Sequence, residues 1–214
     1  MIRALLPLPG PVVGVDVFGD APEGVLLPAE EAVVAGAAAG RRREFATVRH
    51  CARRALRELG GSGSAALLPD ADGVPGWPDG VVGSMTHTRG YRAAAVARAA
   101  DVSRLGIDAE PDRPLREGVL ETIASPAESR ELGGGGGCVC WDRLLFCAKE
   151  AAYKAWFPHA RVRLGFRDVA VSFTGPASAG GRFEARILHG AGELLRGRWA
   201  AGGGMLLAVV AAGA

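Results

Sequence analysis

Asp108 and Glu110 stand two positions apart in the segment Gly-Ile-Asp-Ala-Glu-Pro, residues 106–111. In a β-strand, side chains at positions i and i+2 point to the same side, so a strand here presents both carboxylates together. Two carboxylates that close repel each other unless a proton or a cation lies between them. Mg²⁺ is the natural cation, because it binds one or two carboxylates together with phosphate oxygens and water. A solvated strand end before Pro111 is the simpler alternative.

Glu150 lies beside Lys149 and four residues before Lys154, in Lys-Glu-Ala-Ala-Tyr-Lys. On a helix, Glu150 and Lys154 share a face and can form an exposed ion pair that contributes about 0.3–0.5 kcal/mol. The same geometry also offers a third carboxylate for a metal ion and two ammonium groups for phosphates. Helix statistics alone favour the ion pair. Only two of the 25 basic residues are lysines, and this scarcity, which suggests a need for a compact ammonium, leaves the two interpretations level.

A third candidate is the arginine-rich segment that begins at Arg41. Arg41 and Arg49 are about two helical turns apart, so their long side chains can reach one phosphate. His87, which ends the segment Gly-Ser-Met-Thr-His, could donate to the same phosphate, although a lone histidine is more often structural. A solvated arginine face and a nucleic-acid site are the alternatives. Phe45 is the helix's one aromatic residue and is assigned to the core, so a platform for stacking bases is missing.

Two long amphipathic helices position these groups. In Arg41–Leu59 apolar residues recur at a spacing of three to four, and Gly60-Gly61 ends the helix. Trp141–Trp156 is the second helix, expected to end near Pro158. Ser125-Pro-Ala-Glu128 predicts a capping box and a short helix start. We further predict a helix over 28–38, strands over 12–18, 81–87, 91–98, 102–109, 167–173, 182–189 and 205–211, and a loop at the five glycines 133–137.

The order of elements predicts an α+β fold with two similar halves. A long helix followed by several strands occurs twice, over residues 41–109 and 141–211. We place the boundary so that residues 1–104 carry the arginine-rich helix and the His87 segment. Residues 105–214 then carry the paired carboxylates and the Lys-Glu-x-x-x-Lys helix.

Composition excludes several classes of protein. The chain has 214 residues, 22% charged residues and a formal net charge of +2. An ordinary charged fraction with a net charge near zero excludes a wholly disordered chain. A protein that binds nucleic acid mainly by electrostatic attraction is expected to be much more basic. No apolar run reaches the 18–20 residues of a membrane span. Prolines interrupt the apolar start, so we expect extended chain there rather than a signal peptide, and a cytoplasmic protein. Cysteine spacing does not fit a structural zinc site, so we expect free thiols at Cys51, Cys138, Cys140 and Cys147.

Together these segments resemble the 4′-phosphopantetheinyl transferase superfamily, in particular the group that activates siderophore and polyketide synthases. The combination of Gly-x-Asp-x-Glu with Lys-Glu-x-x-x-Lys is highly specific for that family. The matching stretches are residues 41–53, 77–87, 106–111 and 141–158.

The resemblance implies a pseudo-twofold α+β fold, each half a long helix packed on a mainly antiparallel sheet, with coenzyme A in the cleft between the halves. It implies Mg²⁺-dependent transfer (Mn²⁺ being a substitute) of the 4′-phosphopantetheine arm from coenzyme A to a serine of an apo acyl or peptidyl carrier protein. The other product is adenosine 3′,5′-bisphosphate. We expect a monomer that uses neither nucleic acid nor membrane.

The resemblance also implies roles for individual residues. Asp108, Glu110 and Glu150 would hold Mg²⁺ against the diphosphate, and Glu150 would take the proton from the carrier serine. Lys149 and Lys154 would contact the diphosphate, with Lys154 fixing Glu150 or protonating the leaving group. The 3′-phosphate would be held by Arg41, Arg49 and His87, and the nucleotide pocket would be lined by Gly73, Pro75, Ser84, Met85 and Thr86.

One position departs from the family pattern. Relatives often carry a lysine in the loop before the Gly-x-Pro turn, where this chain has Asp72. We therefore expect altered nucleotide contacts in that loop and retained activity. The five glycines lie where the carrier is thought to dock. A catalytically silent coenzyme A-binding protein is the alternative function.

Overall fold

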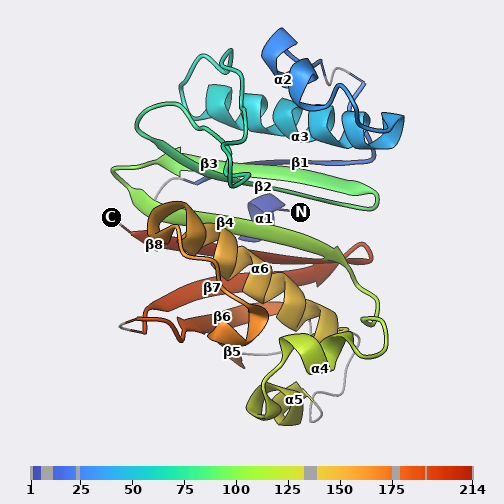
Figure 1. Ribbon diagram of the computed structural model, residues 1–214, viewed down its shortest axis with the longest axis vertical. Helices are drawn as coiled ribbons and strands as arrows, with labels where there is room; N and C mark the ends of the chain where they lie inside the picture. Colours follow the sequence, from blue (N-terminus) through green and yellow to red (C-terminus); the bar gives the residue numbers. More distant parts are fainter. Residues whose placement is uncertain are drawn as a thin grey trace. The chain divides into compact units, whose positions relative to one another are not determined.

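We describe the computed structural model of the chain, which covers residues 2–5, 12–22, 25–132, 139–174, 179–190 and 192–213. The chain divides into two compact units (Figure 1). Unit 1 comprises residues 1–105 with 213–214, and unit 2 comprises residues 106–212. The five-glycine segment, for which a loop was predicted, lies outside the described residues.

Unit 1 is a helix packed on a small antiparallel sheet. The three strands have the order β1-β3-β2, and α3 (Ala39–Glu58) runs along one face of this sheet (Figure 1). The core between them includes Val15, Cys51, Leu56, Ala94 and Val96. The predicted strands are confirmed as β1 (Val13–Phe18), β2 (Val81–Thr88) and β3 (Tyr91–Arg98).

The pattern of apolar residues explains α3. Cys51, Ala52, Ala55 and Leu56 recur at helical spacing and pack against the sheet. Gly60, with φ of +96°, follows the end of the helix. The shorter helix α2 (Pro28–Val33) begins at Pro28 as predicted but ends five residues before the expected Ala38. Gly36 lowers helix propensity there.

The N-terminal segment differs from the expected extended chain. Residues Ile2–Leu5 form a short helix, α1. Ile2 is fully buried, and Arg3 forms an ion pair with Glu58 of α3 at 2.6 Å. These two tertiary contacts fix a segment whose own sequence favours no regular structure.

Unit 2 contains most of a five-stranded sheet with the order β4-β8-β7-β6-β5. The pairs β5–β6, β6–β7 and β7–β8 are antiparallel, which confirms the α+β class. The five strands are β4 (Val102–Pro111), β5 (Val169–Thr174), β6 (Gly180–Ile187), β7 (Leu194–Gly202) and β8 (Met205–Gly213).

The sequence prediction missed β7. Its buried residues Leu195, Gly197 and Trp199 alternate with exposed or half-buried arginines, a pattern typical of a strand. Gly197 obscured this pattern because glycine usually weakens a strand. It lies opposite Phe183 of β6, and a Cβ at this position would come within 2.2 Å of the Phe183 ring. The glycine therefore makes room for an aromatic side chain.

The second long helix, α6, extends beyond its predicted end. It spans Trp141–Ala160 and includes Pro158. Proline costs least in the first turn of a helix, where its N–H would have no partner. Here it lies in the last turn, where it removes one hydrogen bond of that turn and the helix still continues for two residues. Arg161 then ends the helix in the left-handed region with φ of 54°.

Short helices precede and follow α6. Helix α5 (Pro126–Leu132) begins with the predicted capping box: the Ser125 amide donates to Glu128 at 2.7 Å, and the Glu128 amide donates to the Ser125 hydroxyl at 3.3 Å. The remaining short helices are α4 (Val119–Ile123), which was not predicted, and the 3₁₀ turn η1 (Phe166–Asp168). Among the described residues, no helix combines the length and apolar character that crossing a membrane requires.

Candidate functional site

Gly106 allows β4 to pass very close to α6. A Cβ at this position would lie 2.0 Å from the carbonyl oxygen of Ala151 and 2.5 Å from the amide nitrogen of Ala155. Both are backbone atoms in the middle of a helix and cannot move aside. The glycine of the Gly-x-Asp-x-Glu motif is therefore the residue that lets the carboxylates of the strand meet the helix.

Asp108 contacts the second lysine of the helix. Lys154 Nζ donates to Asp108 Oδ1 at 2.6 Å and to the carbonyl of Ile107 at 3.3 Å. Burial alone would lower the pKa of Lys154, but the charges of Asp108 and Glu150 outweigh it and raise the pKa. Lys154 therefore stays a cation within a group of carboxylates.

Glu110 is held by an arginine that the sequence analysis did not identify. Arg143 Nη1 donates to Glu110 Oε2 at 2.9 Å, and other nitrogens of Arg143 donate to the carbonyls of Arg113 and Pro114. Burial and the charge of Asp108 raise the pKa of Glu110, while Arg143 lowers it. The signal for Arg143 was its position seven residues before Glu150, which places both on one face of α6.

Glu150 borders a cavity in unit 2. Burial raises the pKa of Glu150; the nearby Lys154 lowers it, and the charge of Asp108 raises it again. Asp108 thus acts electrostatically on both other carboxylates. The cavity has a volume of about 220 Å³ and is lined by Lys149, Glu150, Tyr153, Leu164, Gly165, Phe166 and Val169.

The three carboxylates fit a magnesium ion by their chemistry. They supply hard oxygen ligands. Burial, with a smaller contribution from the charge of Asp108, raises the pKa of Glu110 and of Glu150, and a bound cation would favour the charged form of both carboxylates. Within the described ranges, no group of three or more His, Cys, Asp or Glu side chains is already gathered as a metal site. In this structure Lys154 and Arg143 provide the positive charge instead.

The structure does not bring Lys149 together with these groups. Its side chain is 1% exposed, and its ammonium donates to Glu128 and to the carbonyls of Ile123 and Phe166 at 2.8–2.9 Å. These three contacts use all three donors of an ammonium. The Lys149 ammonium is thus held by these acceptors and is not turned towards the carboxylates, because adjacent residues of a helix point about 100° apart. Its expected contact with a diphosphate stays a prediction.

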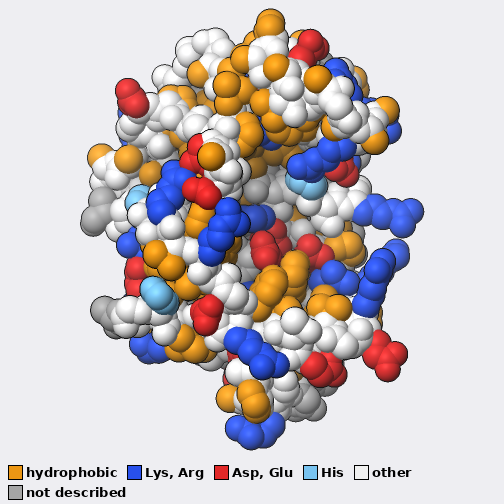
Figure 2. Space-filling view, viewed as in Figure 1, with side chains coloured by type: hydrophobic (Ala, Val, Ile, Leu, Met, Phe, Trp, Pro, Cys, Tyr) orange, Lys and Arg blue, Asp and Glu red, His pale blue; other side chains and the backbone are white. Residues whose placement is uncertain are grey.

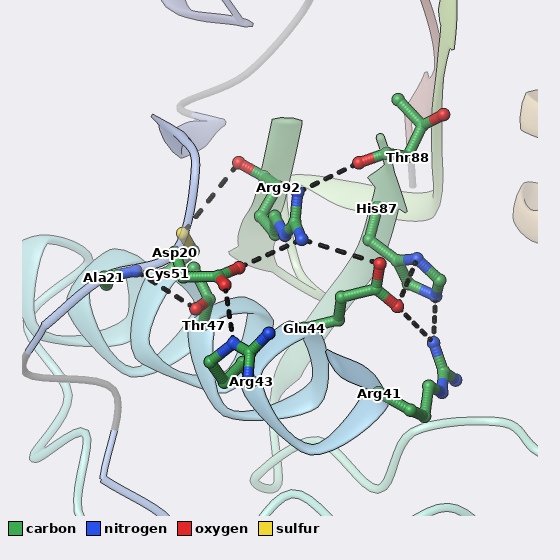
Figure 3. Close-up of polar contacts among 10 residues, drawn as sticks. All are labelled: Asp20, Ala21, Arg41, Arg43, Glu44, Thr47, Cys51, His87, Thr88 and Arg92. Carbon is green, nitrogen blue, oxygen red and sulfur yellow. Dashed lines mark hydrogen bonds and ion pairs between the residues drawn. The ribbon is translucent and has the colours of Figure 1, made fainter. Parts of the chain in front are cut away.

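In unit 1, Arg41 and His87 meet as expected (Figure 3). Arg41 Nη1 lies 2.5 Å from His87 Nε2. Glu44, which was not predicted, lies beside both: its Oε2 is 3.5 Å from Arg41 Nη1 and 3.7 Å from His87 Nδ1. The sequence signal for Glu44 was its place one turn after Arg41 on the same helix.

Behind Glu44 lies a buried arginine, Arg92, also missed from the sequence (Figure 3). It is paired with His87 across the β2–β3 ladder. Arg92 Nη2 lies 3.0 Å from Asp20 and 3.5 Å from Glu44 Oε1, and Nη1 donates to the carbonyl of Thr88. Asp20 also pairs with Arg43 at 3.1 Å. Acidic and basic groups from β3, from α3 and from the segment after β1 therefore pair with one another here.

Arg49 is buried rather than exposed. Its guanidinium carbon lies 3.2 Å from the centroid of the Phe45 ring, and Nε donates to the carbonyl of Leu67 at 3.3 Å. Burial lowers the pKa of Arg49 to about 10; Glu30 opposes this shift, and the charge of Arg41 adds to it. An anion near Arg41 and Arg49 would relieve their repulsion. Phe45 lies in the core, as assigned from the sequence.

The expected nucleotide-binding segment lies on β2. Met85 packs against the core of unit 1, while Ser84 and Thr86 are buried and point to the opposite face of the strand. The segment Gly73–Pro75 forms a turn in which Gly73 has φ of +84° and the Asp70 carboxylate accepts from the amides of Asp72 and Val74. The Asp72 side chain is exposed.

The face of the molecule in Figure 2 carries acidic and basic side chains interspersed with apolar ones. A protein that binds nucleic acid through its phosphates is expected to gather basic groups in one patch or stripe. The distribution on this face does not favour that alternative.

Comparisons with known proteins identify the family of the chain. A family described as the 4′-phosphopantetheinyl transferase N-terminal domain matches residues 29–97, and one described as the 4′-phosphopantetheinyl transferase superfamily matches residues 104–201. The chain is 47% identical to the 4′-phosphopantetheinyl transferase Svp of Streptomyces mobaraensis, over 100% of this chain and 90% of the relative. It is 45% identical to PptT of Mycobacterium tuberculosis (91% and 89%) and 44% identical to Npt of Nocardia iowensis (86% and 88%). The chain belongs to the 4′-phosphopantetheinyl transferase superfamily.

Proposed function

We propose that this transferase moves the 4′-phosphopantetheine arm of coenzyme A to a serine hydroxyl of an apo acyl or peptidyl carrier protein. The observation that carries the proposal is the meeting of β4 and α6 in unit 2. There Gly106 brings Asp108 within 2.6 Å of Lys154, and the charge of Asp108 acts on both Glu110 and Glu150. Phosphoryl transfer requires this kind of charge arrangement and little covalent chemistry from the protein.

Asp108, Glu110 and Glu150 are the residues that would hold Mg²⁺. When bound, Mg²⁺ neutralises charge on the diphosphate oxygens. Arg143 holds Glu110 in one orientation through a half-buried ion pair, which supports a role in arranging the carboxylates.

Glu150 is the residue best placed to accept the serine proton. A carboxylate is a weak base for a hydroxyl, so proton removal must accompany the attack on phosphorus. Burial raises the pKa of Glu150 and makes it a better base. The serine oxygen forms a bond to the phosphorus of the pantetheine phosphate while the bond to the bridging oxygen breaks. Adenosine 3′,5′-bisphosphate leaves.

Lys154 contributes a permanent positive charge. Its pKa is raised, so it remains protonated and cannot act as the base. Its hydrogen bond to Asp108 fixes the orientation of that carboxylate, and its positive charge can attract the diphosphate.

In unit 1 we assign the 3′-phosphate to Arg41, Arg49 and His87. Arg41 lies in the first turn of α3, where the partial positive charge of the helix also favours an anion. The turn at Gly73 and Pro75 and the segment Ser84–Thr86 are assigned to the nucleotide. The cavity beside Glu150, which mixes polar and apolar side chains, suits the pantetheine arm.

The assignment requires one coenzyme A molecule to contact both units. Each unit contains a 20-residue helix and antiparallel strands, and we infer that the two halves are structural repeats related by a pseudo-twofold. A single chain then supplies every residue of the site, so we expect a monomer.

The test is incubation with coenzyme A, Mg²⁺ and a panel of apo carriers, read by intact mass. The expected result is addition of one phosphopantetheine arm. Glu150→Gln should abolish transfer and keep coenzyme A binding, while Glu184→Gln, which alters an exposed ion pair on β6, should behave like the unaltered protein. Binding without transfer to any carrier would instead favour the silent coenzyme A-binding protein.

A further inference from the structure

Glu44 is a carboxylate in a place where the proposed function calls for cations. It lies on α3 within 3.7 Å of two of the three groups assigned to the 3′-phosphate, Arg41 and His87. A negative charge there repels a phosphate, so we expect Glu44 to favour phosphate binding in another way that outweighs this repulsion. The contacts of the two oxygens of Glu44 show how it does so.

Arg92 fixes the first oxygen. Glu44 Oε1 lies 3.5 Å from Arg92 Nη2, and the Arg92 side chain is 8% exposed. Arg92 does not need Glu44 for charge balance, because Asp20 lies closer, at 3.0 Å. Arg92 therefore acts as an anchor that turns the second oxygen of Glu44 towards His87 (Figure 3).

The second oxygen faces the imidazole ring. Arg41 Nη1 lies 2.5 Å from His87 Nε2, and since a guanidinium can only donate, Nε2 must accept. The ring is then neutral with its proton on Nδ1, the nitrogen that lies 3.7 Å from Glu44 Oε2. That distance is longer than a hydrogen bond, so the attraction in this state is electrostatic.

We propose that Glu44 is a positioning residue that makes His87 selective for the 3′-phosphate of coenzyme A. When the phosphate binds, Arg41 turns from His87 Nε2 to a phosphate oxygen. His87 takes a proton from solvent on Nε2 and donates it in a hydrogen bond to the phosphate. Glu44 Oε2 balances the resulting imidazolium from the Nδ1 side, as a carboxylate orients a histidine in other sites.

This inference rests on the proposed function, and the test separates the two. Transfer rates are measured with coenzyme A and with 3′-dephospho-coenzyme A for the unaltered protein and for Glu44→Gln, His87→Gln and the double variant. Glu58→Gln is the matched control, since Glu58 lies on the same helix and pairs with Arg3 and Arg54.

We expect Glu44→Gln to lower kcat/KM for coenzyme A about tenfold through KM, with kcat and the rate with dephospho-coenzyme A unchanged. The unchanged rate with dephospho-coenzyme A also shows that the variant is folded. In the His87→Gln background, Glu44→Gln should add no further loss, because Glu44 acts through His87.

Two results would overturn the inference. If Glu44→Gln keeps or increases the preference for coenzyme A, Glu44 merely repels the ligand or supports the fold. If the unaltered protein uses both donors equally, the assignment of the 3′-phosphate to unit 1 is wrong as well.

Nitrogen NMR of ¹⁵N-histidine provides a direct signature. The chain has four histidines, and loss of one pair of ring-nitrogen signals in His87→Gln assigns His87. Adenosine 3′-monophosphate should convert His87 from the Nδ1–H tautomer to the imidazolium in the unaltered protein and fail to do so in Glu44→Gln. Conversion in both proteins would contradict the role of Glu44.

Discussion

Lys149 and Glu150 are neighbours in sequence, but their surroundings give them different roles. Both residues line the same cavity, but the Lys149 ammonium is enclosed by three acceptors, whereas burial and the charge of Asp108 raise the pKa of Glu150. The rarity of lysine predicts that both lysines are needed as ammonium groups, and in the structure each ammonium pairs with a carboxylate. It could not indicate that one of them serves packing, since that depends on Glu128, which is 21 residues away along the chain.

Lys149→Met is expected to destabilise the protein, because it leaves the Glu128 carboxylate buried without its cation. The cost of breaking one buried ion pair from one side is about 3–5 kcal/mol. Urea unfolding measures the loss, and replacing Glu128 by Gln in the same chain should recover part of it.

Lys154→Met serves as the comparison. It should reduce transfer far more than it reduces stability, since Lys154 is part-buried and borders the candidate site. Equal losses of stability in the two variants, with no recovery from Glu128→Gln, would contradict the assignment of Lys149 as structural.

Cys51 and Cys147 are expected to resist thiol reagents in the folded protein. Burial, with a smaller contribution from Asp16, raises the pKa of Cys51 to about 12, and burial raises that of Cys147 well above its usual value. The thiolate is the reactive form, so almost none is present at pH 8. Peptide mapping after alkylation should find both residues modified only in denaturant, and rapid modification without denaturant would contradict the prediction.

At the scale of elements, the site depends on the close approach of β4 and α6. Asp108 and Glu110 come from the strand, and Arg143, Glu150 and Lys154 come from one face of the helix. Neither element alone gathers three carboxylates with two cations. The distance between them is set by the residue that has no side chain, Gly106.

Gly106→Ala tests this contact directly. The added methyl group would meet the α6 backbone at Ala151 and Ala155, so the strand and helix must separate. We expect a loss of about 2–3 kcal/mol, typical of overpacking, together with loss of transfer. Gly202→Ala is the control because a Cβ there meets nothing within 4 Å; a Gly106→Ala protein with full activity would show that the close approach is not needed.

The sequence predicted these elements better than it predicted their contacts. Hydrophobic patterning located both long helices and β2, β3 and β4 to within a few residues, because the helices bury apolar residues at regular spacing and β3 is a nearly continuous apolar, buried run. It failed at β7, where Gly197 makes room for the Phe183 ring of a neighbouring strand. It also failed at Pro158, which was expected to end α6 and instead lies within the last turn of the helix. Arg143, Glu44 and Arg92 were missed because each is defined by a partner far away in the chain.

At the scale of the whole molecule, the proposed reaction assigns different parts of one ligand to the two units. The 3′-phosphate is assigned to Arg41, Arg49 and His87 in unit 1, and the diphosphate to the carboxylates and Lys154 in unit 2. The two assignments are chemically independent, because only the second requires Mg²⁺. A fragment of coenzyme A that carries only the 3′-phosphate should therefore bind without the metal.

Removal of Mg²⁺ by a chelator is expected to abolish transfer and to weaken coenzyme A binding about tenfold, since the diphosphate then meets uncompensated carboxylates. Adenosine 3′-monophosphate lacks the diphosphate, so its affinity should be the same with and without chelator, whereas Arg41→Ala should weaken both ligands. Isothermal titration measures all four cases. If chelation weakened adenosine 3′-monophosphate as much as coenzyme A, the metal would act on the 3′-phosphate too, and the division of the ligand between the two units would have to be abandoned.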